Sequence, residues 1–450
     1  MMDTPICDFV KTYSESRNIR LHMPGHKGVP VLGPEDRDIT EIDGADNLYA
    51  PDGIIKASEN NASALFGCRT YYSTEGSSLC IRAMLCLALG AKCSASIRPV
   101  VLAARNAHKT FITAAALLDF DVHWIYPGAQ DSYHSITLTP AMVEQGLQSS
   151  AILPSAVYIT SPDYLGKIAD IRAIAEVCHR YDVPLLIDNA HGAYLRFLPE
   201  SLHPMDLGAD MCCDSAHKTL PVLTGGAYLH VGGRFAGLGA QAVKNALSLF
   251  GSTSPSYLIL QSLDLANPYM ETLPDRLSAM LPDIYSLKSE LSSHGFTLCG
   301  QEPLKLTLSM AGYGYTGDEA ADILRSQGIV CEFHDRDFLV FMLTPQNDTA
   351  DLEALKKALL SLPKKEKRVP PTFSFSAPKQ AISIREAYFQ PSEELPVSKC
   401  AGRILALPNV GCPPAVPIVM CGELIDDDAI RLFHYYNMEF CTVVRESDYS

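Results

Sequence analysis

Residues 184 to 192 read Pro184-Leu185-Leu186-Ile187-Asp188-Asn189-Ala190-His191-Gly192, a short apolar run that ends in a carboxylate. Runs that are apolar throughout indicate strands of a sheet that is covered on both faces. Similar runs alternate with stretches typical of helices between residues 70 and 231; they are Thr70–Ser73, Val100–Ala104, Val122–Tyr126, Ala156–Thr160 and Ala227–Val231. This alternation predicts an α/β layer with a mostly parallel sheet, in which ligands bind at the carboxyl ends of the strands.

The rest of the chain predicts further domains around this layer. Strands are expected near residues 304–310, 328–333 and 338–343, which indicates a smaller α/β domain, and the Pro- and Lys-rich stretch 362–379 is typical of an exposed linker. We therefore expect an N-terminal arm with dimer contacts over residues 1–62, a large cofactor domain over 63–281, a small α/β domain over 282–369 and a C-terminal domain over 370–450.

The composition excludes several classes of protein. The chain has 450 residues, of which 47% are hydrophobic and 19% charged, so it can bury a large core and is not a disordered chain. A net charge of −15 argues against nucleic acid or an anionic membrane surface as the main partner. No apolar stretch is long enough for a membrane helix, and the start lacks the apolar core of a secretory signal. We expect a cytoplasmic protein with free thiols.

No metal site is predicted. The chain contains 14 cysteines, and the one adjacent pair, Cys212-Cys213, lacks the C-x-x-C spacing of zinc and redox motifs. A structural role is therefore the interpretation that we favour for this pair.

Two residue types near strand ends point to chemistry. Lys218 is bracketed by Ala216, His217, Leu220 and Pro221, and apolar surroundings favour the neutral amine that Schiff-base formation requires. The alternative is a lysine at a strand end whose amino group reaches solvent. Asp188 could be a simple cap or turn residue, but beside a Schiff-base lysine it could keep a pyridine nitrogen protonated.

Two further segments complete the pattern. Ser73-Thr74-Glu75-Gly76-Ser77-Ser78 follows a strand and opens an apolar helix, whose N-terminus is suited to bind phosphate, although an ordinary N-cap is the alternative. His108 follows the end of another predicted strand. A phosphate loop, an imidazole, a strand-end aspartate and a lysine, in this order, fit an enzyme that uses pyridoxal 5′-phosphate (PLP).

Several motifs resemble those of the bacterial Orn/Lys/Arg decarboxylase family. They are His-Met-Pro-Gly-His-Lys-Gly at 22–28, Asn-Leu-Tyr-Ala-Pro-Asp-Gly-Ile-Ile at 47–55, Arg-Asn-Ala-His-Lys at 105–109, Asp-Asn-Ala-His-Gly at 188–192, Ser-Ala-His-Lys-Thr-Leu-Pro-Val-Leu-Thr at 215–224 and a late run at 412–423. The resemblance covers nearly the whole chain. It implies the aminotransferase-like fold type I architecture and PLP-dependent decarboxylation of arginine, lysine or ornithine, which yields a polyamine or a polyamine precursor.

The resemblance also implies roles for particular residues. Lys218 would form the Schiff base, Asp188 would pair with the pyridine nitrogen, His108 would stack on the ring and His191 would lie near the ring oxygen. The phosphate would be held by Gly76, Ser77, Ser78, Ser215 and His217. Ser254, in Thr253-Ser254-Pro255, would reach the cofactor of the other subunit, which implies a homodimer with shared active sites.

The sequence departs from the family pattern at several positions. Glu75 stands where the family usually has Asn or Gln, so it must point away from the phosphate, accept hydrogen bonds from backbone donors or weaken cofactor binding. Asn189 replaces a usual Glu, Gly225 replaces a common Gln, and Ala415 and Cys421 replace Gly and Pro of the late motif. The N-terminal receiver-like domain of the larger family members is absent, so the short form is the expected type.

Substrate binding and reaction type leave alternatives open. Glu332 and Asp335 are candidates to bind the cationic side chain of a basic amino acid, and both could equally be surface turn residues. An aminotransferase on the same fold is the main alternative, but the stretch 338–344, where such enzymes usually carry an arginine for the substrate carboxylate, contains none. A PLP-binding homologue without catalytic activity is the second alternative.

Overall fold

The computed structural model describes residues 2–90, 98–128, 135–370, 377–408 and 417–446. The chain forms two compact units, and each unit combines two stretches of sequence. The first comprises Met1–Gly90 and Ile171–Ala279, and the second comprises Ala91–Asp170 and Met280–Ser450. The predicted domain boundaries near residues 62, 281 and 369 stay a prediction.

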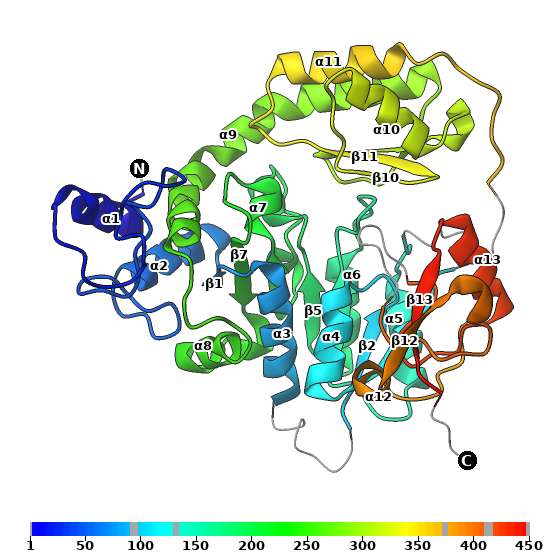
Figure 1. Cartoon of the computed structure of the whole chain (residues 1–450), viewed down its shortest axis with the longest axis horizontal. Helices are drawn as coiled ribbons and strands as arrows, with labels where there is room; N and C mark the ends of the chain where they lie inside the picture. Colours follow the sequence, from blue (N-terminus) through cyan, green and yellow to red (C-terminus); the bar gives the residue numbers. More distant parts are fainter. Residues whose placement is uncertain (1, 91–97, 129–134, 371–376, 409–416, 447–450) are drawn as a thin grey trace. The chain divides into compact units, whose positions relative to one another are not determined.

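Four strands of the first unit stand in the order β1-β7-β6-β5. Figure 1 labels β1, β7 and β5 of these strands. They are β1 (Arg69–Ser73), β7 (Ala227–Val231), β6 (Met211–Asp214) and β5 (Leu185–Asp188). β5 and β6 are parallel, with Asp188 opposite Cys213, whereas β7 is antiparallel to both β1 and β6. Every residue of β5, β6 and β7 is buried, as expected for strands covered on both faces.

Helices surround these strands in the first unit. Helix α3 (Gly76–Leu89) packs against β1, β6 and β7, α2 (Ile54–Phe66) packs against β1, and α6 (Ile171–Arg180) packs against β5. The remaining helical segments are α1 (Pro5–Glu15), η2 (Ala193–Phe197), η3 (Pro204–Leu207), α7 (Ala216–Thr219), η4 (Gly233–Phe235), α8 (Ala240–Ser248) and the start of α9 (Tyr257–His294). The buried residues of α3 lie on several sides of the helix, which indicates that it is enclosed rather than on the surface.

In the second unit, three parallel strands stand in the order β4-β2-β3. They are β4 (Ala156–Thr160), β2 (Val100–Ala104) and β3 (Asp121–Ile125). In the sequence, helix α4 (Lys109–Leu118) connects β2 to β3, and helix α5 (Pro140–Ser149) lies between β3 and β4. The six strands predicted between residues 70 and 231, including Val100–Ala104 and Ala156–Thr160, thus agree with the structure to within one residue at each end.

A second sheet in this unit is antiparallel and has the order β10-β11-β9-β8. Its strands are β8 (Thr297–Cys299), β9 (Lys305–Ser309), β10 (Phe333–His334) and β11 (Phe338–Met342), and in Figure 1 helices α10 (Gly317–Ser326) and α11 (Thr349–Leu360) lie on the same side of them. The strand predicted at 328–333 is wrong over most of its length. Because β10 is at the edge of the sheet, a strand can pair with it on one side only. Val330, in the segment before β10, is exposed.

The C-terminal part of the second unit has its own small core. Strands β12 (Ser392–Pro396) and β13 (Phe440–Val444) pair in antiparallel fashion, with α12 (Ile384–Phe389) and α13 (Asp427–Tyr435) nearby in the sequence. Side chains that include Val397, Leu405, Phe433 and Val443 form one buried cluster. Two further short helices of this unit are η5 (Ala311–Tyr313) and η6 (Val397–Lys399). Residue Ala415 of the late motif lies outside the described residues.

The described part of the chain bears on the expectations about membrane helices and cysteines. No helix there is long and apolar enough to cross a membrane. Cys80, Cys178, Cys212 and Cys213 are buried free thiols, whereas Cys86 and Cys331, which also stand in apolar stretches of the sequence, are free thiols that are only partly buried.

A buried ion pair joins the end of β2 to the C-terminal part of the second unit. The two guanidinium nitrogens Nη1 and Nη2 of Arg105 each donate to one carboxylate oxygen of Glu423, at 2.6 Å, and both side chains are essentially inaccessible. Arg105 also lies over the rings of Trp124 and Tyr126. Because removing one partner leaves an uncompensated buried charge, this pair should be costly to break.

Replacing Glu423 by Gln should therefore lower the free energy of unfolding by about 3 to 5 kcal/mol. Urea unfolding followed by circular dichroism measures this change. The matched control is Glu393→Gln, which breaks the partly exposed pair between Glu393 and Arg403 and should cost below about 1 kcal/mol. Equal losses in the two variants would contradict the prediction.

Candidate active site

The carboxyl ends of two neighbouring parallel strands place two aspartates in the core of the first unit. Asp188 ends β5 and Asp214 ends β6, and the side chains are 2% and 0% exposed. One carboxylate oxygen of Asp188 accepts a hydrogen bond from the backbone N–H of Ala190 at 3.2 Å, and the thiol of Cys213 lies 3.8 Å from it. Asp188 is thus held at a strand tip, where the sequence predicted the partner of a pyridine nitrogen.

Lys218 and His191 come together in the same unit. Lys218 lies in the single turn α7, which directly follows β6, and its amine Nζ is 3.0 Å from Nε2 of His191. His191 lies three residues beyond the end of β5. The pairing of β5 with β6 therefore brings the lysine to the segment that also carries Asp188.

The start of α3 forms a polar cradle with the segment after β6. The hydroxyl of Ser215 donates to the hydroxyl of Ser77 at 2.8 Å, and the N–H of Gly76 donates to the carbonyl of Gly225 at 2.7 Å. The backbone N–H of His217 donates to the carbonyl of Gly226 at 3.2 Å, and its ring Nδ1 lies 3.0 Å from the same oxygen. Four of the predicted phosphate-binding residues, Gly76, Ser77, Ser215 and His217, thus belong to one connected group.

Space is open in front of this cradle. Gly76 has φ +71°, a conformation that favours glycine, and no heavy atom lies within 4 Å of the point where a Cβ would stand. Ser77 and Ser78 follow in the first turn of the 14-residue helix α3. Hydroxyl groups and helix N-terminal N–H groups suit a phosphate, an amine suits a carbonyl carbon, and a buried carboxylate suits a protonated ring nitrogen, so these side chains fit PLP.

The structure answers the question raised by Glu75. Its side chain is exposed, and its carboxylate accepts a hydrogen bond from the backbone N–H of Ser252 at 2.6 Å. The N–H of Ser254 in turn donates to the hydroxyl of Ser252 at 3.1 Å. The charge of Glu75 is therefore used to hold the segment that contains Ser254.

The glycine at 225 also has a structural reason. It has φ +101°, and a Cβ there would lie 2.9 Å from the carbonyl oxygen of Thr74. A larger residue would push against the strand that leads into the cradle.

Three predicted residues lie in the second unit, namely His108, Asp335 and Glu332. His108 caps α4, where its Nδ1 accepts from the N–H of Thr110 at 3.2 Å. Asp335 accepts hydrogen bonds from the N–H groups of Asp337 and Phe338 at 2.8 and 2.7 Å, which is the turn-forming arrangement named as the alternative for this residue. The roles of these residues toward cofactor or substrate stay predictions.

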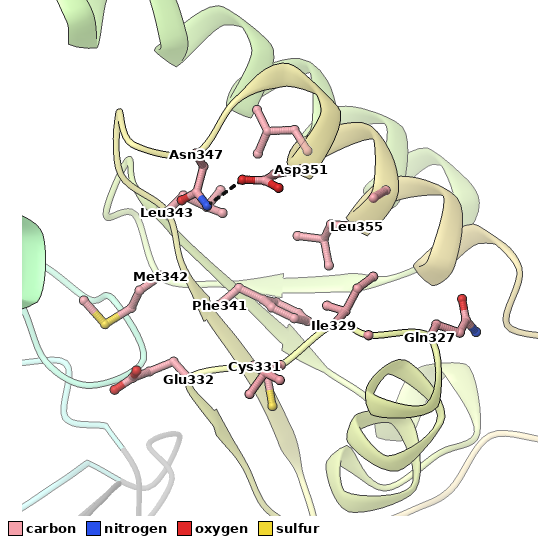
Figure 2. Close-up of a pocket in the computed structure, with 14 residues that line it drawn as sticks. Gln327, Ile329, Cys331, Glu332, Phe341, Met342, Leu343, Asn347, Asp351 and Leu355 are labelled. Carbon is pink, nitrogen blue, oxygen red and sulfur yellow. Dashed lines mark hydrogen bonds between the residues drawn. The ribbon is translucent and has the colours of Figure 1, made fainter.

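Glu332 lies at one end of a cavity of about 580 Å³ in the second unit (Figure 2). Ile329, Phe341 and Leu355 supply apolar lining, and Met342 lies near Glu332, with Gln327 at the other end. Glu332 is exposed and accepts a hydrogen bond from the hydroxyl of Tyr164 at 3.0 Å. Its carboxylate thus remains reachable from solvent, as substrate binding would require.

Sequence reasoning missed a buried cluster behind Asp188. Asp214 accepts hydrogen bonds from Nδ2 of Asn189 at 2.7 Å, Nε2 of His203 at 3.1 Å and Nε2 of His230 at 3.0 Å. All four side chains are fully buried. The sequence signal was present in Asp214, which directly precedes Ser215, but nothing in the sequence links it to the distant histidines.

The electrostatics of this cluster follow from its burial. Burial acts to raise the pKa of Asp214, but His203 and His230 oppose it and hold this pKa well below its usual range. Burial lowers the pKa of His230, against the opposing effect of Asp214. Burial likewise raises the pKa of the Cys212 and Cys213 thiols well above the usual value, which supports their structural interpretation.

Comparisons with known proteins point to one family. Residues 4–293 match the sequence model of the family described as "Orn/Lys/Arg decarboxylase, major domain". The chain is 30% identical to the arginine decarboxylase of Bacillus subtilis (strain 168), over 95% of this chain and 92% of that protein, and 29% identical to the arginine decarboxylase of Bacillus anthracis, over 95% and 92%.

A solved structure shows the same fold. The lysine decarboxylase LdcF of Francisella novicida superposes with a TM-score of 0.80 at 17% identity, over 99% of this chain and 81% of that one. The predicted aminotransferase-like α/β fold class is therefore confirmed.

The buried His230 predicts a dependence of stability on pH. Its neighbours are Asp214, His203, Thr70 and Cys68. Because its pKa is lowered in the folded protein, the unfolded chain binds a proton below about pH 6.5 that the folded chain does not, so stability falls as the pH falls below that value. Between pH 6.5 and 5, His230→Gln should lose about 1 kcal/mol less of unfolding free energy than the unmodified protein.

Urea unfolding at half-unit pH steps measures this difference. His294→Gln, at an exposed position, is the control and should follow the unmodified protein. An equally steep fall in His230→Gln would refute the assignment.

Proposed function

This chain belongs to the Orn/Lys/Arg decarboxylase family, and we propose that it decarboxylates a basic amino acid with PLP as cofactor. The reaction consumes one proton and converts the amino acid into CO₂ and the corresponding amine, a polyamine or a polyamine precursor. The observation that carries this proposal is the convergence, in one unit, of the Lys218 amine, the His191 imidazole 3.0 Å away and the buried strand-end Asp188.

Bound PLP supplies a carbonyl carbon that reacts with amines and a pyridine ring that accepts electrons from the substrate. The amine of Lys218 would hold PLP at that carbon. Asp188 would hold the proton on the pyridine nitrogen, and its burial strengthens this interaction. The Ser77 and Ser215 hydroxyls and the start of α3 would bind the phosphate, and the lysine could return the proton to the α-carbon.

Arginine is the substrate that we propose, with lysine and ornithine as alternatives. Two relatives that align with 95% of this chain are named arginine decarboxylases. A guanidinium group needs an acidic partner, and the reachable carboxylate of Glu332 is the candidate in the second unit. Strand β11 is where an aminotransferase would carry an arginine for the substrate carboxylate. Its sequence, Phe338-Leu339-Val340-Phe341-Met342, contains none, which favours decarboxylation.

We propose further that the enzyme is a homodimer with shared active sites. In the N-terminal arm, polar contacts such as that of Arg20 with the carbonyl of Asp36 hold the backbone. Large apolar side chains of the same arm nevertheless face solvent in the single chain; they are Ile19, Leu21, Met23, Val29, Val31 and Leu32. A segment that exposes several large apolar side chains is typical of an interface, and Ser254 is exposed as well, as a residue that serves a second chain would be.

Loss of the Lys218 amine should abolish catalysis. Purified protein supplied with PLP is expected to release CO₂ fastest from arginine, and Lys218→Ala should slow this release at least about 1000-fold and remove the visible absorption band of bound PLP. Radiometric CO₂ capture and absorption spectra measure the two effects.

Lys288→Met is the matched control for Lys218→Ala. Lys288, like Lys218, is partly buried, and burial lowers its pKa to about 8, but its amine donates to the carbonyls of Glu302 and Pro303 in the second unit. Lys288→Met should keep both the band and the CO₂ release. Absence of CO₂ from arginine, lysine and ornithine, together with amino transfer to a keto acid, would refute the decarboxylase proposal.

Shared active sites predict complementation between two defective chains. Ser254→Glu should weaken PLP binding by placing a carboxylate beside the phosphate, and Lys218→Ala should be inactive. In a mixed dimer one site carries both changes and the other carries neither, so co-expression of the two chains under separate affinity tags should restore up to half of the normal activity. Tandem purification isolates the mixed dimers, and activity no higher than that of either parent would contradict shared sites.

A further inference from the structure

We propose that Asp214 is a positioning residue of the PLP site, which holds Asp188 and Lys218 in place from within the core. This inference rests on the proposed function, because it concerns the binding of the same cofactor. Asp214 does not extend from the strand ends toward the cradle but is enclosed by protein, with 0% of its side chain exposed.

The carboxylate of Asp214 is the common acceptor of the cluster. Oδ1 accepts from Nδ2 of Asn189 at 2.7 Å and lies 3.5 Å from the thiol of Cys212. Oδ2 accepts from the Nε2 atoms of His203 and His230 at 3.1 and 3.0 Å. An ionised carboxylate costs several kcal/mol to bury without donors, and here donors from three other segments surround it.

Asn189 transmits this arrangement to Asp188. Its backbone N–H donates to the carbonyl of Cys213 at 2.9 Å, so the residue after Asp188 is bound to β6 by its backbone and to Asp214 by its side chain. Gly192 is needed here as well, because a Cβ at that position would lie 2.0 Å from Oδ1 of Asn189. The backbone that carries Asp188 and His191 therefore has little freedom to move.

The other end of the connection is the segment that follows Asp214. Ser215, the next residue, donates to Ser77, and Lys218 lies in the turn that begins immediately afterwards. One buried side chain thus anchors the strand tip that binds the ring nitrogen and the start of the turn that carries the reactive amine. Its negative charge also favours a proton on groups nearby, among them a pyridine nitrogen beside Asp188.

The same residues could be considered as a metal site. One donor atom each from His203, Cys212, Asp214 and His230 lies within 4.8 Å of the others. However, Nδ1 of His203 accepts from the backbone N–H of Met205, so a proton is on Nε2, the atom that faces Asp214. A protonated Nε2 donates a hydrogen bond and does not bind a metal, which favours the hydrogen-bonded arrangement.

The test compares two aspartates at opposite ends of β6. Asp210, just before the strand, is equally buried and accepts from the N–H groups of Leu185 and Arg234 and from His179. Asp214→Asn and Asp210→Asn should both lower the melting temperature of the cofactor-free protein. Only Asp214→Asn should raise the dissociation constant for PLP about tenfold and lower, by half a unit or more, the pH midpoint at which the visible band of bound PLP changes.

Asn189→Ala is the second variant, because it leaves the carboxylate and both histidines in place. It should weaken PLP binding several-fold with a smaller loss of stability, and it decides the matter if Asp214→Asn does not fold. A dissociation constant and a pH midpoint that stay at their normal values in the folded variants would show that the cluster is only structural and overturn the inference.

Two further outcomes are distinguishable from that one. Elemental analysis that finds one transition-metal ion per chain in the unmodified protein and none in Asp214→Asn would overturn the inference in favour of a metal site. An unmodified protein that develops no visible band with PLP at any concentration would overturn the proposed function itself, and the inference with it.

Discussion

A carboxylate can be ionised inside a protein core only if hydrogen-bond donors replace the water that it loses, and much of the first unit follows from meeting this demand at Asp214. The donors are Asn189 after β5, His203 before β6 and His230 on β7, so three strands or strand ends converge on one side chain. The parallel pairing of β5 with β6 and the antiparallel pairing of β7 make this convergence possible. Site geometry and core stability are therefore coupled in this unit.

The same principle explains how the chain tolerates a carboxylate next to a phosphate cradle. Glu75 stands at the entrance of α3, where an anion would repel a dianionic phosphate, but its side chain is bonded to the N–H of Ser252. The carboxylate of Glu75, which could weaken phosphate binding, thereby holds in place the segment that carries Ser254. In the second unit, Arg105 and Glu423 form a bidentate buried pair, which joins the motif that contains His108 to the C-terminal part.

Much of the fold and part of the site could be predicted from the sequence. The strands near residues 70, 100, 122, 156, 184 and 227 were predicted because each is a local apolar run, and local patterning is readable without the partner strand. The prediction of a strand over 328–332 was wrong because an apolar run forms a strand only where its backbone can pair with a neighbouring strand. This segment precedes β10, which is an edge strand. The residues Gly76, Ser77, Ser215, His217, Asp188, His191 and Lys218 were identified from motifs, and the structure brings them together in two connected groups within one unit.

By itself, the sequence determined that this chain is an α/β protein with the motifs of the Orn/Lys/Arg decarboxylase family, since apolar patterning and motif spacing are properties of neighbouring residues. Only the tertiary structure decided which buried side chains hold those motifs in place. His203, Asp214 and His230 are separated by 11 and 16 residues, and nothing local indicates that their side chains meet. Their contact depends on the order and register of β5, β6 and β7, and a hydrogen bond between distant residues exists only once that register is set.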